Sequence, residues 1–215
     1  MMIDYQYIDE EKILLNTNQK ELKLAIIADT HVPDRVNTLH PKLIPLLEKT
    51  NVDAILHCGD VIEPAILDQI SAFRPVFTVL GNRDAFFSKA KYPFKLEFQI
   101  FNRKIGLYHG FLSIRHYFPD KLQYIFQGYH FEKYFHIGQT LFPDADVLCY
   151  GHTHTAEIRR YTKQLIINPG TAGPRSMNGG SSFAILRIQK SGKMNAHFVS
   201  LQGFENSRGR WVKSI

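Results

Sequence analysis

The 215-residue chain is 44% hydrophobic and 13% aromatic, which suits one domain with a substantial core and excludes general disorder. No apolar run approaches the length that spans a bilayer, and the acidic N-terminus lacks the basic start and apolar stretch of a signal peptide. Cys58 and Cys149 lie inside apolar runs and are expected to be reduced, buried thiols, so we expect a cytoplasmic protein without a membrane partner. The net charge of +6 favours anionic substrates and allows nucleic acid as a partner without requiring it.

The first half of the chain alternates apolar runs with amphipathic segments. Residues 1–22 precede the first clear element and are expected either to form a local strand or hairpin or to stay mobile. The apolar runs end in polar residues and predict central strands, and the segments between them predict helices; the strands are 22–31, 52–60 and 75–84, and the helices are 39–49 and 63–73. This order predicts a parallel sheet with right-handed crossovers.

The second half is dominated by alternating segments that read as hairpins. The turns are expected at Asn102-Arg103, at Thr162-Lys163 and at Ser191-Gly192, so this half should be mostly antiparallel strand. The basic segment 207–213, SRGRWVK, is expected to be a solvated end.

The block 111–142 is dense in Phe, Tyr and His and fits neither pattern. Its apolar residues at positions 118, 122, 125 and 126 indicate a helical part. Two alternatives stay open. The block is either a helix packed on the sheet, or a lid or partner surface through which copies of the chain associate, because connections of this length are often functional.

Five of the strand-like runs end in polar groups that can bind a metal. The groups are Asp29-Thr30-His31, Gly59-Asp60, Gly81-Asn82-Arg83-Asp84, His109-Gly110 and Gly151-His152-Thr153-His154. Sites in open α/β sheets form beyond the carboxyl ends of the strands, and glycine permits the tight turns and close backbone approach that such a site needs. One ending of this kind would be an ordinary surface turn, but five in one chain indicate a shared site.

The order of these motifs resembles that of the calcineurin-like metallophosphoesterases. The short chain and the segment INPGT, residues 167–171, are similar to the small prokaryotic phosphodiesterase branch, which also includes the metallophosphoesterase-fold subunit of retromer. The resemblance covers roughly residues 23–200. It implies an α/β protein with a layered αββα sandwich of mixed sheets flanked by helices. We therefore divide the chain into an N-terminal extension (1–22), a metallophosphoesterase domain (23–202) and a basic C-terminal tail (203–215).

The resemblance also implies two divalent metal ions and assigns their ligands. The first ion would be held by Asp29, His31 and His154, the second by Asn82, His109 and His152, and Asp60 would bridge both. Two adjacent cations need a shared anionic ligand, and a water between them loses a proton readily and can attack phosphorus. Imidazole and carboxylate ligands suit Mn, Fe, Ni, Co or Zn, and the sequence does not choose among them.

Four further residues are candidates for roles in catalysis or substrate binding. Many family members carry a histidine that protonates the leaving group where this chain has Arg83, and a guanidinium is a poor proton donor that can still stabilise charge on the phosphoryl group. Asp84 is expected to orient Asn82, Arg83 or a ligand histidine. Arg35 and Arg175, like Asn82 and Arg83, are candidates for contacting a substrate phosphate.

The resulting hypothesis is a metal-dependent phosphodiesterase acting on a small phosphoester or a nucleotide. Two alternatives stay open: a nuclease, which the basic charge balance favours, and a non-catalytic interaction scaffold of the same fold with residues 111–142 as its binding face.

Overall fold

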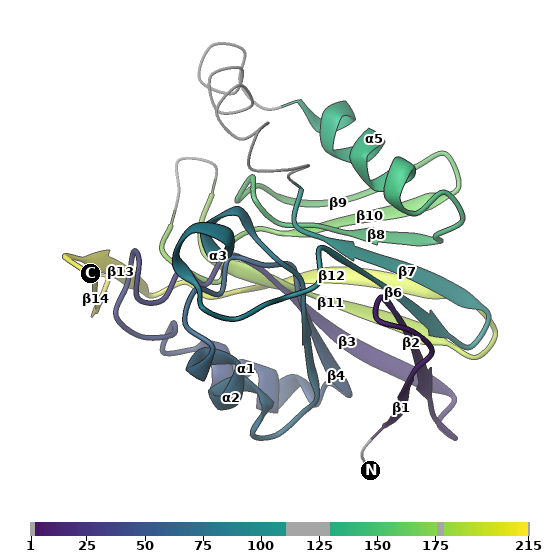
Figure 1. The fold of residues 1–215 in the computed structure, drawn as a ribbon. Coiled ribbons are helices and arrows are strands. Elements are labelled where there is room, and N and C mark those ends of the chain that lie inside the picture. Colours follow the sequence, from purple (N-terminus) through teal and green to yellow (C-terminus); the bar gives the residue numbers. More distant parts are fainter. Residues whose placement is uncertain (1–2, 111–129, 176–178, 215) are drawn as a thin grey trace.

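The computed structural model describes residues 3–110, 130–175 and 179–214. Two mixed sheets face each other, with helices on the outer side of each (Figure 1). The larger sheet has the order β1-β2-β6-β7-β8-β10-β9, the smaller has the order β12-β11-β3-β4-β5, and β13 and β14 form a separate hairpin. This is the layered α/β sandwich that the sequence predicts.

The elements have the following bounds. The strands are β1 Asp4–Tyr7, β2 Lys12–Asn16, β3 Glu21–Ile27, β4 Ala54–His57, β5 Val76–Thr78, β6 Lys95–Ile100, β7 Arg103–Tyr108, β8 Val147–Cys149, β9 Ala156–Tyr161, β10 Gln164–Pro169, β11 Ser182–Gln189, β12 Met194–Ser200, β13 Phe204–Ser207 and β14 Arg210–Lys213. The helices are α1 Leu43–Thr50, α2 Ala65–Ser71, α3 Asn82–Phe87 and α5 Phe131–Leu141.

The predicted βαβαβ unit is present. β3 pairs with β4 and β4 with β5, both parallel, and α1 and α2 connect them. Buried residues of the two helices, including Leu43 and Ile66, pack on the outer face of the smaller sheet. Pro45 is tolerated because it lies in the first turn of α1, where a backbone N–H would have no intrahelical acceptor.

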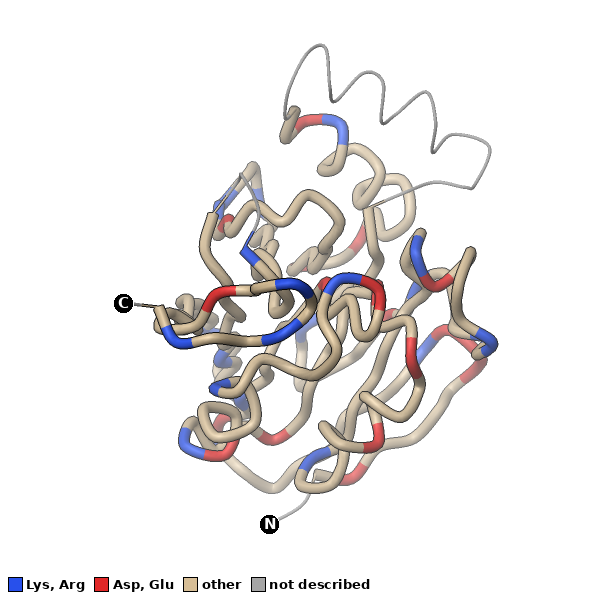
Figure 2. The backbone as a smooth tube through the Cα atoms, turned by 90° about the vertical axis from the view of Figure 1, so that its left-hand side faces the viewer, with Lys and Arg blue, Asp and Glu red and all other residues tan. Residues whose placement is uncertain are grey.

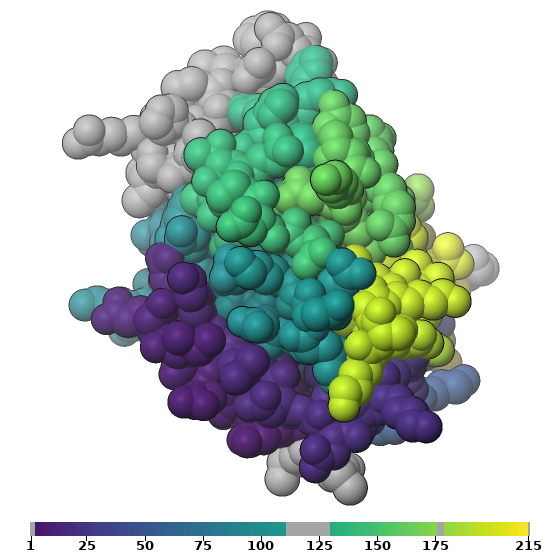
Figure 3. Space-filling model, turned by 90° about the vertical axis from the view of Figure 1, so that its right-hand side faces the viewer, coloured from purple at the N-terminus to yellow at the C-terminus, as the bar shows by residue number. Residues whose placement is uncertain are grey.

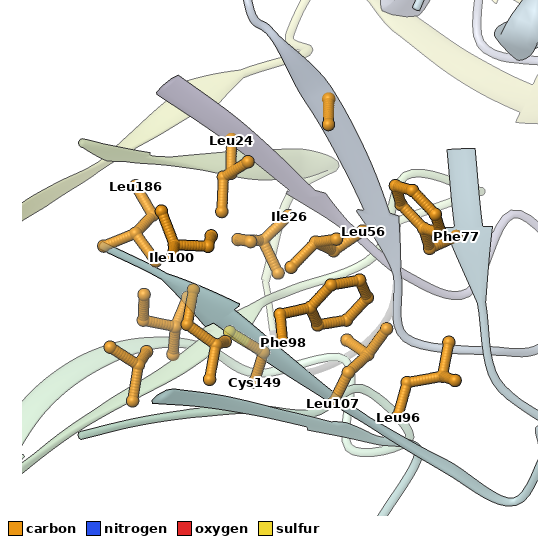
Figure 4. Close-up of a cluster of buried hydrophobic side chains, with 14 of the residues drawn as sticks. Leu24, Ile26, Leu56, Phe77, Leu96, Phe98, Ile100, Leu107, Cys149 and Leu186 are labelled. Carbon is orange, nitrogen blue, oxygen red and sulfur yellow. The ribbon is translucent and has the colours of Figure 1, made fainter. Parts of the chain in front are cut away.

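The main core lies between the two sheets. Figure 4 shows Ile26 and Leu56 of the smaller sheet meeting Phe98 of the larger one. Cys58 and Cys149 belong to the same cluster as buried free thiols, as expected. Burial raises the pKa of both thiols, so they stay protonated and apolar.

The second half of the chain contains the three expected hairpins. The first turns at Phe101-Asn102 rather than at Asn102-Arg103, because Ile100 pairs with Arg103 in a register that also brings the buried Phe98 opposite Ile105. The sheet is less antiparallel than expected, since β8 runs parallel to both of its neighbours, β7 and β10.

Both ends of the described chain are structured. Of the alternatives for residues 1–22, the hairpin is found: β1 pairs with β2, and β2 extends the larger sheet by pairing in parallel with β6. Figure 3 shows this purple segment packed beside the teal strands of that sheet. The segment expected to be a solvated end forms the hairpin β13–β14. None of the helices in the described part of the chain has the length and apolar character needed to cross a bilayer.

Of the two alternatives for the aromatic block, the packed helix is found in its described part, where residues 131–141 form α5. Its buried Phe131, Tyr134 and Phe135 form a cluster with Tyr108 of β7 and with Tyr150, which directly follows β8. The helical part expected around positions 118–126 lies outside the described residues.

Candidate metal centre

The polar groups of all five strand ends lie together at one edge of the sandwich. Asp29 and His31 follow β3, Asp60 follows β4, His109 follows β7, and His152 and His154 follow β8, while Asn82 begins α3 after β5. All of these residues except the half-buried His152 are buried. Carboxyl ends of adjacent strands meet at one edge, so topology brings together side chains that are far apart in sequence.

The backbone at this edge is strained. Five of the residues have positive φ angles, between 52° and 68°: Asp29, His31, Asp60, His152 and His154. Left-handed conformation is uncommon for residues other than glycine, and costs about 1–3 kcal/mol at each position. Such strain persists where the surrounding structure and the function require the side chain to point in one direction.

Asp29, His31 and His154 form the first cluster. Nε2 of His31 lies 3.1 Å from Nε2 of His154, and Oδ1 of Asp29 lies 3.4 Å from Nε2 of His154 and 3.7 Å from Nε2 of His31. Oδ1 of Asp29 is buried and accepts no hydrogen bond within the described residues. A buried carboxylate oxygen and two ring nitrogens that converge in this way fit a cation, which would satisfy all three at once.

Asn82, His109 and His152 form the second cluster. Oδ1 of Asn82 lies 2.9 Å from Nε2 of His109 and 2.9 Å from Nδ1 of His152. The other ring nitrogen of His109, Nδ1, lies 2.7 Å from the carbonyl oxygen of Cys58. A hydrogen bond donated from Nδ1 to this carbonyl would leave the lone pair of Nε2 facing the cluster, as in a metal-binding histidine.

Asp60 lies between the two clusters. Its Oδ1 is 3.5 Å from Nε2 of His109, and its Oδ2 is 3.8 Å from Nε2 of His31. Burial raises the pKa of Asp60, with His109 opposing this effect and Asp29 adding to it. The pKa of Asp29 is lowered although burial opposes this, because the charges of His154, His109 and His31 outweigh the burial. Cations would allow both buried carboxylates to stay ionised.

The model of the calcineurin-like phosphoesterase superfamily domain matches residues 22–191. The chain belongs to this family. It is 31% identical to a probable metallophosphoesterase of Methanothermobacter thermautotrophicus, over 82% of this chain and 91% of the relative, and 26% identical to a protein named a phosphodiesterase of Methanocaldococcus jannaschii, over 69% and 83%. The structure of vacuolar protein sorting 29 from Cryptosporidium parvum has the same fold, with a TM-score of 0.64, 21% identity, and coverage of 84% of this chain and 98% of that one.

In this calcineurin-like protein, two glycines are required by the close approach of backbone to a site carboxylate. A Cβ at Gly81 would lie 2.1 Å from Oδ1 of Asp60, and a Cβ at Gly151 would lie 2.8 Å from Oδ2 of Asp29. The N–H of His152 donates to the same Oδ2, at 3.0 Å. Side chains at these two glycines would displace the carboxylates, which explains why glycine stands at positions 81 and 151.

The carboxylate of Asp84 accepts hydrogen bonds from the backbone around the site. We expected it to orient Asn82, Arg83 or a ligand histidine, but its carboxylate accepts three backbone N–H groups. The donors are Asp60 at 2.9 Å, Ile62 at 2.6 Å and Gly81 at 2.8 Å. Asp84 therefore ties the turn after β4 to the turn after β5, and this fixes the strained backbone of Asp60.

Arg83 is held at the rim of the site. Its guanidinium forms an ion pair with Asp34, whose Oδ2 lies 3.0 Å from Nε, and it also lies over the ring of Phe87. Its backbone N–H donates to Oδ1 of Asp60 at 2.8 Å. Asp34 was not among the predicted site residues, yet its carboxylate also lies 3.9 Å from Nδ1 of His31. No sequence motif marks this residue.

Arg35 lies near the first cluster, whereas Arg175 is not joined to it by any contact among the described residues. The exposed Arg35 donates its backbone N–H to the carbonyl of His31 at 2.9 Å. Burial lowers the pKa of His31, and the positive charge of Arg35 adds to this effect. Arg175 is also exposed, and no contact joins it to a site residue within the described part of the chain.

Residues of the INPGT segment and of α5 support the site and were not identified beforehand. Asn168 donates to the carbonyl of Gly151 at 3.0 Å and to Oγ1 of Thr153 at 2.9 Å, and Thr171 donates to the carbonyl of Asp29 at 2.9 Å. The ring of Tyr134 on α5 lies 6.0 Å from the ring of His152. The sequence Asn-Pro-Gly could have indicated this supporting role, because an asparagine side chain commonly orders a turn by bonding to the backbone two residues on.

Proposed function

We propose that this protein is a divalent-metal-dependent phosphodiesterase. Asp29, His31 and His154 would hold one ion, and Asn82, His109 and His152 a second. The observation that carries the proposal is the position of Asp60, whose two carboxylate oxygens face different clusters. A carboxylate in this position is the shared anionic ligand that two adjacent cations require.

The chemistry follows from the donor set. Two divalent ions, when bound, would supply a Lewis acid for the phosphoryl oxygens and would lower the pKa of a water near them. The hydrogen bond of His109 to the carbonyl of Cys58 fixes the direction of its ring. The three N–H groups held by Asp84 fix the backbone that carries Asp60. These groups position the ligands before substrate binds, which is the main contribution that a protein makes to such a site.

Arg83 favours diesters that have good leaving groups. Its guanidinium stays protonated at working pH and cannot donate a proton to an alkoxide, but it can stabilise negative charge on the phosphoryl group. Its ion pair with Asp34 keeps it near His31 and Asp60. A leaving group that departs as a stable anion needs no acid, so aryl diesters should be the best test substrates.

The test combines metal binding with hydrolysis. Chelator-stripped protein is titrated with manganese, zinc and nickel in a calorimeter, and hydrolysis of bis(p-nitrophenyl) phosphate is compared with that of p-nitrophenyl phosphate. We expect two ions for each chain and a faster reaction with the diester. Loss of hydrolysis in His154→Ala, with retention in a control that removes the exposed His197, would place the activity at this site.

Two results would overturn the proposal. Binding of less than one ion for each chain at saturating metal would show that the proposed metal centre does not form. Two bound ions without hydrolysis of either ester would instead favour the non-catalytic scaffold of the same fold.

A further inference from the structure

The hairpin β13–β14 lies outside residues 22–191, the part of the chain that matches the family model. Three hydrogen bonds dock it on the loop that follows His31. Asn206 donates to the carbonyl of Arg35 at 3.0 Å, the N–H of Asn37 donates to the carbonyl of Gly209 at 2.8 Å, and Trp211 donates to the carbonyl of Thr38 at 2.9 Å. The hairpin is therefore fixed in position next to this loop.

The tip of the hairpin carries basic residues. Arg208 and Gly209 have φ angles of 50° and 82° and form a two-residue turn that closes the pair Ser207–Arg210. Figure 2 shows the hairpin, which is found from the C label, crossing the front of the molecule with blue basic positions along it. Docking brings the tip to the loop that contains Arg35.

The guanidinium groups at the hairpin tip and in the loop of Arg35 have no carboxylate partner in the part of the chain that the structure describes. Arg35, Arg208 and Arg210 are exposed, and none of them forms an ion pair with a residue that the structure describes. The nearest acidic residue in the loop, Asp34, is already paired with Arg83. Folding has therefore brought the hairpin tip that carries Arg208 and Arg210 against the loop that carries Arg35. None of the three charges is neutralised by a carboxylate of the described residues, although like charges repel one another.

We propose that Arg35, Arg208 and Arg210 form a cationic rim that binds the phosphates of a single-stranded oligonucleotide next to the phosphodiester that the metal centre would cleave. This inference rests on the proposed phosphodiesterase function and names its substrate class. Guanidinium groups bind phosphate through paired hydrogen bonds. Several cations spread along an exposed rim suit a chain of phosphates better than one small anion. A flexible single strand can bend one phosphate towards buried ligands such as His31 and Asp60, which a rigid duplex would not do.

The test measures binding without cleavage. A fluorescein-labelled oligothymidylate is titrated with chelator-treated, full-length protein at a series of salt concentrations, and anisotropy gives the affinity. The variant Arg208→Asn/Arg210→Gln removes two charges and keeps the turn, because Asn-Gly is the preferred pair for this turn type. Its matched control is Lys190→Gln/Lys193→Gln, which removes two exposed charges from the β11–β12 turn at the other end of β12.

We expect the arginine variant to bind more weakly and to lose about 1.4 from the slope of log affinity against log salt, because each phosphate contact with a single strand contributes about 0.7. The lysine variant should match the wild type. The proposed cationic rim would be overturned if both variants lost equal affinity for the oligonucleotide, or if the wild type showed no salt-dependent binding. Hydrolysis of the aryl diester by a wild type that does not bind the oligonucleotide would refute the substrate class and leave the proposed function intact. If the wild type neither hydrolysed the aryl diester nor bound the oligonucleotide, the result would count against the proposed function as well.

Discussion

The guanidinium of Arg83 is paired with the carboxylate of Asp34 across the mouth of the candidate metal centre. One partner follows the candidate ligand Asn82 and the other lies in the loop after the candidate ligand His31, so the pair connects the surroundings of both clusters. Both side chains are only partly buried, with 27% and 18% of their surfaces exposed. A pair this close to solvent contributes little to stability, so its importance should lie in where it places Arg83.

Asp34→Asn should raise the KM for an aryl diester several-fold and change the free energy of unfolding by less than about 1 kcal/mol. If Asp34 acts by positioning Arg83, the double variant Asp34→Asn/Arg83→Gln should be no worse than Arg83→Gln alone. The check is to measure kinetic constants and urea unfolding for the wild type, the two single variants and the double variant. Fully additive losses would mean that the two residues act independently.

Arg83→His should raise the ratio of alkyl to aryl diester hydrolysis. A histidine can protonate a poor leaving group, and general acid catalysis contributes about 10²–10⁴-fold where the geometry is good. The backbone hydrogen bond from position 83 to Asp60 is kept in the variant. Arg83→Gln is the control, and should slow both reactions without raising the ratio. The measurement is kcat/KM on matched esters at equal metal content. An unchanged ratio would show that this side chain does not face the leaving group.

Asp60→Asn should lose more activity than His154→Ala. The substitution removes the anion between the two clusters, whereas His154 belongs to only one of them. Loss of a residue that merely supports a metal ligand typically costs about 10–100-fold, so loss of a shared ligand should exceed about 100-fold in kcat/KM. Calorimetric titration should show both ions weakened in Asp60→Asn and one in His154→Ala. Near-normal turnover of Asp60→Asn at full metal content would contradict the bridging role.

Asp84→Asn should destabilise the fold by at least about 2 kcal/mol, because an amide cannot satisfy three backbone N–H donors as a carboxylate does. Urea unfolding of the metal-free protein measures this loss directly. Metal affinity should fall as well, since Asp84 fixes the backbone of Asp60. Glu63→Gln changes a nearby exposed carboxylate and serves as the control. A variant of unchanged stability would show that the three hydrogen bonds are dispensable.

His40, which lies nine residues after His31, should make the folded protein acid-sensitive. Burial lowers its pKa to about 4, and Lys42 adds to this effect. The unfolded chain binds a proton below about pH 6.5, while the folded protein resists it until about pH 4. The stability that neutral His40 contributes is therefore fully present above about pH 6.5, and it is lost as the pH falls from about 6.5 to about 4.

His40→Asn tests this effect, because an amide oxygen can accept the N–H of Lys42 that Nδ1 of His40 accepts now. The variant should lose less stability than the wild type between neutral pH and about pH 5, by about 1 kcal/mol. Urea unfolding of both metal-free proteins at the two pH values gives the difference. Parallel losses would show that His40 titrates normally in the folded state.

Local patterns in the sequence were sufficient for much of the fold. Alternation of apolar runs with amphipathic segments predicts β3-α1-β4-α2-β5. A helix buried on one face has apolar residues at helical spacing, and a strand buried on both faces is a short continuous apolar run. Register is harder to predict. The turn at Phe101-Asn102 is fixed by which residues of two strands are buried opposite each other, and no single strand contains that information.

The sequence by itself determined the ligand types and the order of the five motifs at the strand ends. Only the tertiary structure decided what surrounds them. Asp34 meets Arg83 across 49 positions of sequence, and the hairpin reaches the loop of Arg35 across 171. Neither contact has a local pattern, because a side chain's partner across the fold is set by the path of the whole backbone. A motif can therefore name the atoms that would hold a metal, while the charges that surround it follow from how distant segments pack.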